Sequence, residues 1–374
     1  MQKSFLKTAV ILSVILLSTT IVFSQEGIDP EIAPTAAPFL SITPESRGGA
    51  MGDVGAATSP DLNSQHWNSS KYAFLNQDMG VSVSFTPWLR NLVNDINLYY
   101  LTYFKRIDKV QTVSASLRYF SMGTINFTDE GGNLLSQGKP NEFAIDAGYS
   151  RKLSDVIAGS VVFRYIRSDL TNGSGTQGVP GSAFAADLNF YYQQNVKWGG
   201  RKGIVSSGLN ISNIGSKISY DDGVTKEFLP ANLRLGGGYS TEIDRYNKVA
   251  FSLDFNRIMV AKNEDGEDNE NLSVPASFFK SFGDFSMQDV RISVGGEYWY
   301  ADQFAIRAGY HHEHENIGNR KFATAGAGLK FNMLTVDASY IISMSQNNPL
   351  ANTIRFSLAF NFDEMTGKSK KRHL

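Results

Sequence analysis

Residues 353–362 read TIRFSLAFNF, a stretch in which large apolar side chains alternate with small or polar ones. Successive side chains of a β-strand point to opposite faces, so this pattern predicts a strand with one apolar and one polar face. Residues 334–342 alternate in the same way, which indicates a series of similar strands. The apolar face of the first stretch carries Ile354, Phe356, Leu358, Phe360 and Phe362.

Fourteen such runs follow one another from residue 79 onward. Each spans about 10–14 residues, enough for a tilted strand to cross the bilayer core, whereas strands of soluble proteins average about five or six residues. An even number of strands is typical of single-chain outer-membrane barrels. The runs begin near Met79, Asp95, Val110, Asn141, Asp155, Ala183, Gly203, Ala231, Tyr246, Val290, Gln303, Lys321, Leu334 and Asn352.

The links between these runs alternate in length. Four links after odd-numbered runs are long, at residues 121–140, 169–182, 214–230 and 259–289, whereas the links after even-numbered runs are short. Outer-membrane barrels have short periplasmic turns and long external loops. The sequence therefore predicts an all-β fold, a 14-stranded antiparallel transmembrane barrel over residues 79–362 with both chain ends in the periplasm. A soluble β-sandwich is the alternative, and it does not explain the alternating link lengths.

The composition agrees with an exported barrel. The 374 residues include 42% hydrophobic, 12% aromatic and 19% charged residues, no Cys, and a net charge of -1. These values exclude a disordered chain, a disulfide or zinc-thiolate scaffold, and the basic surface that nucleic-acid binding requires. A mean hydropathy of -0.21 is compatible with a membrane barrel, because only every second residue of its strands faces lipid.

The N-terminus reads as a secretory signal peptide over residues 1–24, with cleavage expected before Gln25. Lys3 and Lys7 precede an apolar run of about 15 residues, shorter than the roughly 20 that a membrane anchor helix, the alternative, requires. Residues 25–39 contain three prolines and are expected to form an extended periplasmic arm. Residues 363–374 form a basic tail with Lys368, Lys370, Lys371 and Arg372, which this topology places in the periplasm as a flexible terminus or a partner contact.

Residues 40–78 are expected to form a plug inside the lumen, because closely spaced glycines let one backbone pack against another. A phosphate-binding loop is the competing interpretation, but the Gly-Lys-Ser/Thr ending is missing. Charged residues that recur on the polar strand faces are expected to line the lumen and bind this plug. The plug candidates are Arg47, Gly48, Gly49, Met51, Gly52, Asp53, Gly55, Asp61, Trp67 and Asn68. The lumen candidates are Asp146, Arg164, Asp187, Arg234, Asp254, Arg307, Asp337 and Arg355.

A resemblance to a known family appears in this region. The glycine-rich run and the following Asp resemble the plug of FadL-type transporters of hydrophobic compounds. The chain is more closely similar to the PorV family of the type IX secretion system, over residues 41–47, 51–55, 59–65, 71–74 and 81–90. One departure is Asn68-Ser69-Ser70, where both families usually carry Asn-Pro-Ala; it puts a strict copy of the plug geometry in doubt, but not the fold.

The resemblance to PorV implies a non-enzymatic outer-membrane component of type IX secretion with no cofactor. Its implied partners are the very large translocon barrel, the C-terminal signal domains of secreted cargo, and the cell-surface sortase and attachment complex. Outer-membrane lipid and lipopolysaccharide surround such a protein, and nucleic acid is not a partner. Trp88, Leu89 and Arg90 at the first external rim are the candidate contacts. The alternative is a FadL-type channel for fatty acids or other hydrophobic small molecules.

Other chemistry is weakly represented. His311, His312 and His314 are candidate metal ligands, with a solvated rim as the alternative. The acidic stretch 263–270 lacks the full spacing of a calcium loop. His66 stands alone and is expected to pack in the plug. No nucleophile motif is present, although a catalytic triad can be dispersed along a sequence.

Overall fold

The computed structural model describes residues 35–90, 93, 95–129, 131–171, 178–262, 271–344 and 353–362. All of them belong to one unit by their contacts, Glu31–Leu374. The expected signal peptide, residues 25–34 of the expected arm, the acidic stretch and the basic tail lie outside the described residues.

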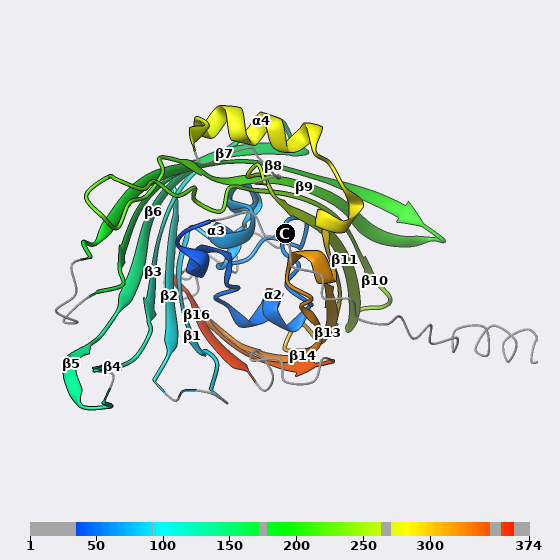
Figure 1. Cartoon of the computed structure of the whole chain (residues 1–374). Coiled ribbons are helices and arrows are strands. Elements are labelled where there is room, and N and C mark those ends of the chain that lie inside the picture. The colour runs from blue at the N-terminus through cyan, green and yellow to red at the C-terminus, as the bar shows by residue number, and fades with distance from the viewer. Residues whose placement is uncertain are drawn as a thin grey trace, which may run out of the picture. The chain divides into compact units, whose positions relative to one another are not determined.

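Fourteen strands of the described chain pair into one closed antiparallel barrel, which is drawn in Figure 1. The first and last strands close the ring, with Gly80 opposite Asn361. The barrel strands are β1 (Met79–Pro87), β2 (Asn97–Arg106), β3 (Gln111–Ser121), β6 (Asn141–Lys152), β7 (Ile157–Asp169), β8 (Gly181–Trp198), β9 (Arg201–Gly215), β10 (Asn232–Glu242), β11 (Asn247–Ile258), β12 (Arg291–Tyr300), β13 (Phe304–His312), β14 (Lys321–Phe331), β15 (Leu334–Ser343) and β16 (Ile354–Asn361). Each begins within two residues of its expected start, so the predicted barrel is confirmed.

Strand lengths depart from the expected range at several places. β8 has 18 residues and β9 has 15, whereas β16 has 8. The extra length of β8 and β9 lies around the turn at Gly199 and Gly200, where Trp198 is exposed. The inward–outward alternation of β8 is lost there, as expected for a ribbon that projects beyond the barrel rim.

The links fall into two groups at opposite ends of the barrel, which we call the short-turn end and the long-link end. Two long links contain elements that the sequence did not predict. The β3–β6 link forms a hairpin of β4 (Ile125–Thr128) and β5 (Leu134–Gly138), and the β11–β12 link contains α4 (Val274–Gly283) and η4 (Met287–Asp289). The β13–β14 link holds η5 (Glu315–Ile317). None of the helices in the described ranges is long and apolar enough to cross a membrane.

The two faces of the wall have opposite character, as the alternation predicts. On β16, Phe356 points outward and is 49% exposed, whereas Arg355 points inward and is 2% exposed. Inside the wall, Arg164 binds Asp146 at 2.7 Å and Asp187 at 2.9 Å. Because buried charges need partners, such pairs allow a ring of charged side chains to face the lumen.

The chain before β1 lies within the ring of strands in Figure 1, and residues 35–78 are called the inner segment. The short helices of this segment are η1 (Pro38–Ser41), α2 (Ser46–Ala50), α3 (Ser64–Trp67) and η2 (Ser69–Phe74). Its described part begins at the long-link end, where Thr35 bridges Phe228 of the β9–β10 link.

Residues 35–39 therefore lie at the long-link end. The periplasmic arm, by contrast, was expected at the short-turn end. Their apolar side chains give the physical reason. Phe39 is fully buried in a cluster with Leu98, Phe120 and Ile166, which line the lumen at the long-link end. Burying a phenylalanine is worth about 1.5–3 kcal/mol, so this contact holds the segment inside the barrel.

Candidate functional site

Glu45 precedes α2 of the inner segment as its N-cap residue. Its carboxylate accepts hydrogen bonds from the backbone N–H groups of Arg47 and Gly48, each at 2.6 Å, as an N-cap residue does. It also accepts a bond from the indole N–H of Trp67 at 2.9 Å. Burial raises the pKa of Glu45 to about 7, and the negative charge of Asp61 acts in the same direction.

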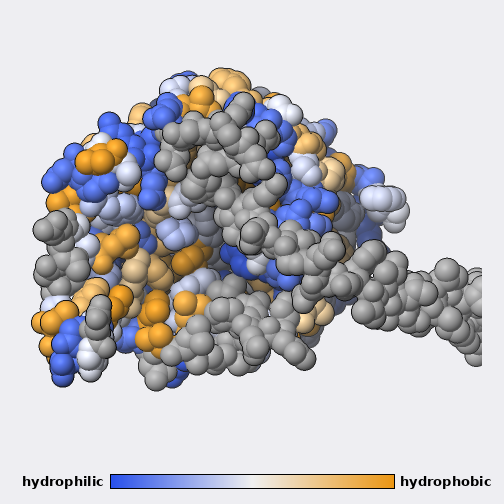
Figure 2. All heavy atoms as spheres, in the orientation of Figure 1, coloured by the Kyte–Doolittle hydropathy of each residue, from blue (hydrophilic) through white to orange (hydrophobic). Residues whose placement is uncertain are grey.

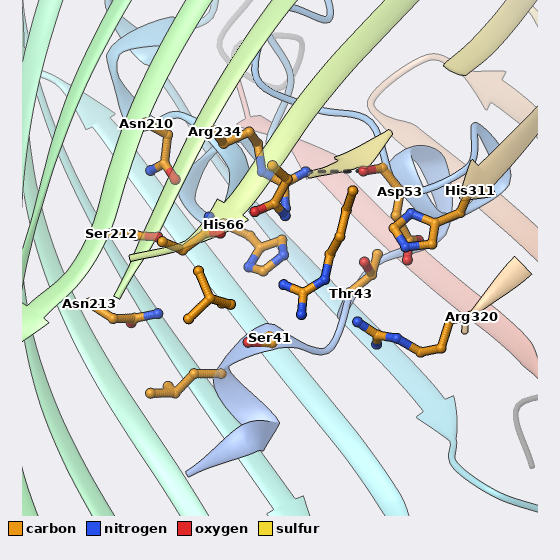
Figure 3. A pocket seen from close by; sticks show the side chains of 15 residues that line it. Ser41, Thr43, Asp53, His66, Asn210, Ser212, Asn213, Arg234, His311 and Arg320 are labelled. Atoms are coloured by element: carbon orange, nitrogen blue, oxygen red, sulfur yellow. Dashed lines mark hydrogen bonds between the residues drawn. The ribbon is translucent and has the colours of Figure 1, made fainter. Parts of the chain in front are cut away.

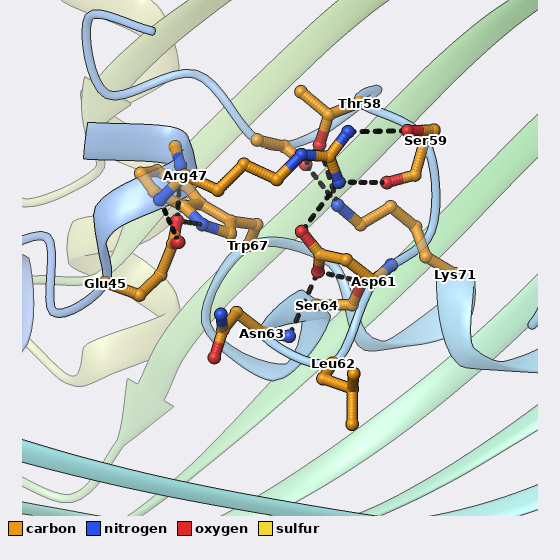
Figure 4. A network of polar contacts seen from close by, with 12 residues as sticks. Glu45, Arg47, Thr58, Ser59, Asp61, Leu62, Asn63, Ser64, Trp67 and Lys71 are labelled. Atoms are coloured by element: carbon orange, nitrogen blue, oxygen red, sulfur yellow. Dashed lines mark hydrogen bonds and ion pairs between the residues drawn. The ribbon is translucent and has the colours of Figure 1, made fainter. Parts of the chain in front are cut away.

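Arg47 connects the inner segment to the barrel wall, as Figure 4 shows for its inner-segment partners. Its guanidinium bonds Asp61 at 2.8 Å and both carboxylate oxygens of Glu297 on β12, at 2.8 and 3.0 Å. The network continues on the wall, where Arg307 bonds Glu297 and Asp337, each at 2.6 Å. These charges are buried and paired, which is the arrangement that makes buried ions tolerable.

Glycines of the inner segment allow its backbone to lie close to the backbone of the barrel wall. Gly52 has a φ of 74°, and a Cβ there would lie 2.6 Å from the backbone nitrogen of Tyr310. The wall also has a glycine at this contact. A Cβ at Gly309 would lie 2.0 Å from the carbonyl carbon of Met51. Here two backbones touch without side chains between them, which only glycine permits.

A second set of contacts holds residues 53–56 against β10, β11 and β16. The Asp254 carboxylate accepts hydrogen bonds from the N–H groups of Gly55 at 2.8 Å and Ala56 at 2.9 Å. Arg234 donates to the carbonyl of Asp53 at 3.1 Å, and Arg355 lies 3.7 Å from the Asp53 carboxylate. A Cβ at Gly49 would lie 2.7 Å from Arg355, so this glycine makes room for the arginine.

The Asn68-Ser69-Ser70 departure finds a structural role in the wall contacts. The Asn68 amide donates to the carbonyls of Ala56 at 3.1 Å and Phe190 at 2.8 Å. The Ser69 hydroxyl lies 2.7 Å from that of Ser160 on β7. The Ser70 hydroxyl donates to the Asn68 side chain. Serines at these two positions therefore make hydrogen bonds that a proline and an alanine cannot make.

The ten expected plug residues all belong to the inner segment, and several of them, such as Arg47, Gly52 and Asn68, contact the wall directly. Sequence reasoning missed Glu297 on the wall and, in the inner segment, the buried titratable groups Glu45 and Lys71. The Lys71 ammonium donates to the Gly55 carbonyl at 2.8 Å and to the Thr58 hydroxyl at 2.9 Å, and burial lowers its pKa to about 8. Glu45 and Lys71 both lie in stretches that carry the PorV resemblance, residues 41–47 and 71–74, but nothing in the sequence showed that these two side chains are buried.

His66 packs in the inner segment as expected, and it has a specific partner. Its Nδ1 lies 2.6 Å from Nη2 of Arg118 on β3. Because a guanidinium only donates, this nitrogen must accept the bond, which requires a neutral ring. Burial and the positive charge of Arg118 lower the pKa of His66 well below its usual value.

Two chambers flank the inner segment. The chamber at the long-link end, seen in Figure 3, has a volume of about 50 Å³ and is lined by His66, Arg234, Arg291 and Arg320 among others. The chamber at the short-turn end measures about 850 Å³, and Arg47, Glu297 and Trp299 are among the residues that line it. Among the described residues, no side chain lines both chambers.

The three rim candidates do not share one environment. Trp88 is half-buried and packs against the apolar cluster of the long-link end. Leu89 has a φ of 52°, and Arg90 is exposed.

The three histidine candidates are separated by the strand geometry. The His311 ring faces the lumen, bonds Ser293 at 2.8 Å and stacks on Phe322. His314 caps η5, and the intervening Glu313 is engaged by Arg291 and Arg320. Within the described ranges, no group of three or more His, Asp or Glu side chains is arranged to hold a metal ion.

A closed antiparallel barrel with an apolar exterior and a chain segment folded into its lumen defines an outer-membrane β-barrel protein. The chain belongs to the PorV family: the family model of the type IX secretion system protein PorV matches residues 25–265, more than half of its length. The comparison with curated proteins gave no match.

Solved structures share the fold. One crystal structure of the Pseudomonas putida toluene transporter TodX matches with a TM-score of 0.51 and 11% identity, covering 83% of this chain and 95% of TodX. A second TodX crystal structure matches with a TM-score of 0.51 and 13% identity, covering 86% of this chain and 99% of TodX. Identities this low show that the fold is shared and nothing more.

Proposed function

We propose that the chain is a non-enzymatic outer-membrane component of type IX secretion that binds the translocon and the C-terminal signal domains of cargo. It delivers the cargo to the cell-surface sortase and attachment complex. The observation that carries this proposal is the match of the PorV family model over residues 25–265. In this proposal the long links face the cell exterior and the short turns face the periplasm.

The inner segment acts in this proposal as a plug that keeps the barrel closed. Buried contacts support that role on several sides of the lumen, from Glu297 on β12, Asp254 on β11 and Ser160 on β7. A barrel filled in this way offers its outer wall and its long links as binding surfaces. Arg90 and the β4–β5 hairpin are exposed at the long-link end and are the first candidates for contact with partners.

A channel for hydrophobic small molecules is the alternative, and the shared TodX fold is the observation that favours it. The side chains that line the lumen argue against a channel for hydrophobic molecules. An apolar ligand needs a predominantly apolar pocket, whereas charged side chains such as Arg234, Arg291 and Arg320 line the long-link chamber. The apolar cluster at that end is already filled by Phe39 and Leu40.

Deletion of the gene separates the two functions. The proposal predicts that proteins with a C-terminal secretion signal fail to reach the cell surface, while uptake of fatty acids and toluene is unchanged. A complementing variant that lacks residues 125–138 tests the hairpin as a partner contact, because this hairpin is outside the closed barrel sheet. Normal surface display together with lost uptake would reject the secretion role in favour of the channel.

A further inference from the structure

The helix α4 exposes large apolar side chains on its outer face, although Val274 and Phe278 on its inner side pack against the apolar cluster of Phe228, Ala231 and Val260. Ser277 and Ser281 face the protein and are each 1% exposed. Phe279 on the opposite face is 71% exposed, and Phe282 is 48% exposed. A surface helix of a soluble protein turns its apolar stripe inward, so this arrangement needs a different neighbour on its outer side.

The strand register shows on which side of the wall α4 lies. On β11, Phe251, Leu253 and Phe255 point outward and are exposed, so Arg257 occupies the next outward position. Yet Arg257 is only 7% exposed, because residues of α4 and the turn after it cover it.

Arg257 fixes this cover through backbone contacts. Its guanidinium donates to the carbonyls of Ser281 at 2.6 Å and Asp284 at 3.0 Å, and it lies over the ring of Phe285. The helix is therefore held on the outer face of the barrel at the long-link end. Figure 1 draws α4 outside the space that the strands enclose, and Figure 2 shows hydrophobic side chains at that place.

The apolar face of α4 continues into the turn that follows it. Phe285 is 57% exposed and Met287 is 67% exposed, and the ring of Phe285 lies against Arg257 on the outward face of β11. The outward face of a membrane barrel contacts lipid. The exposed phenylalanines are thus continuous with the lipid-facing surface.

We propose that α4 is an interfacial helix whose Phe279 and Phe282 lie in the lipid leaflet at the long-link end. A helix of this kind lies in the membrane plane with its apolar face about 5–10 Å into the headgroup and acyl boundary. Ser273 begins the helix as its N-cap, and Pro275 follows in the first turn, so the short helix is locally well defined. Its neighbour is lipid and not a protein partner.

The chain has no cysteine, so one introduced thiol can carry a polarity-sensitive NBD fluorophore at a known position. The full chain with Phe279→Cys is inserted into vesicles of phosphatidylcholine and phosphatidylglycerol, some of which carry spin labels near the glycerol or at the chain end. We expect the label at 279 to lose most of its emission with the shallow spin label and little with the deep one. Phe282→Cys, a second position on the same face, should respond in the same way.

Two matched positions calibrate the measurement. Phe251→Cys on the outer face of β11 should be quenched by the deep spin label, and Val224→Cys, 85% exposed in the β9–β10 link, should respond to aqueous iodide alone. If the labels at 279 and 282 behave like the label at 224, α4 faces water or awaits a protein partner, and the proposal is overturned.

Discussion

The Arg47 guanidinium lies 2.8 Å from Glu297 although 250 residues separate them, and this pair joins the inner segment to the barrel wall. Both side chains are buried, and Arg307 shares the same carboxylate. Because the pair is a buried ionic contact between the inner segment and the wall, beside hydrogen bonds such as those from Gly55 and Ala56 to Asp254, its loss should loosen the inner segment more than the barrel.

Replacing Arg47 by alanine leaves Asp61 and Glu297 without their common partner. Removing one member of a buried ion pair costs roughly 3–5 kcal/mol, and we expect a loss of that order in the free energy of unfolding. Urea titration in phospholipid vesicles measures it. The matched control is Lys248→Ala, since Lys248 pairs with Glu242 and Asp302 at the exposed rim, where such pairs contribute about 1 kcal/mol or less. Equal losses in the two variants would contradict the role given to Arg47.

The close contact between Gly309 and Met51 predicts that a side chain at position 309 destabilises the protein. An alanine at 309 would force two backbones apart, and overpacking of this kind costs about 1–3 kcal/mol. Gly237→Ala is the control, because a Cβ there meets no atom within 4 Å. A thiol label at a Ser64→Cys position, buried in the native chain, should react faster in the Gly309→Ala background. If the thiol at 64 reacted equally fast in the Gly309→Ala and Gly237→Ala backgrounds, the contact at Gly309 would not be what holds the inner segment against the wall.

The raised pKa of Glu45 predicts a pH dependence of stability. The pKa of this carboxyl rises from its ordinary value of 4.5, which applies to the unfolded chain, to about 7 in the folded protein. Its contribution is therefore full below pH 4.5 and is lost as the pH rises through 7, by about 3 kcal/mol at most. Glu45→Gln cannot titrate, so the free energy of unfolding should fall less between these pH values than in the wild type. Parallel pH profiles for the two proteins would exclude this assignment.

Removal of the inner segment tests the plug. Without residues 36–75 the lumen loses the side chains that tie its wall together, and we expect a water-filled pore with measurable conductance in planar bilayers. Circular dichroism first establishes that the shortened chain retains its β-structure. Deletion of residues 125–138, outside the barrel sheet, should leave the conductance low. A folded barrel that stays closed without its inner segment would refute the plug.

Zinc should have little effect on the folded chain. His311 is directed into the lumen and engaged by Ser293, and two arginines occupy Glu313, so the ligands expected from the sequence do not converge. Metal binding to the native state raises its melting temperature by mass action. We expect low micromolar zinc to leave the melting temperature unchanged. A rise that His311→Ala abolishes would restore the metal site.

The barrel could be predicted closely because its strands obey a local rule. Alternation with period two is visible in any single run, such as the residues around Phe356, and closure into a ring adds no new pattern. α4 was not predicted because its apolar side chains lie on both faces, Phe278 inward and Phe279 and Phe282 outward, so no single apolar stripe marks a helix. The hairpin of β4 and β5 is too short and too exposed to leave a clear alternation.

The sequence predicted that the inner segment fills the lumen, but not which wall residues it contacts. Its glycines predicted close backbone contact. They did not predict the partners of that contact, because Gly309 and Tyr310 are distant in sequence from Gly52. Lys71 lies in a stretch that carries the PorV resemblance, but its carbonyl partner at Gly55 is set by tertiary folding. The placement of Phe39 at the long-link end likewise depends on a cluster assembled from several strands.

The most direct test of the secretion role is quantification of cargo with a C-terminal secretion signal on the surface of cells that lack this gene. The account predicts that such cargo is lost from the surface and accumulates inside the cell. The wild-type gene should restore display, and purification from gently solubilised membranes should then recover the protein with a much larger barrel. Normal surface display in the deletion strain, with the protein always purified alone, would contradict the account.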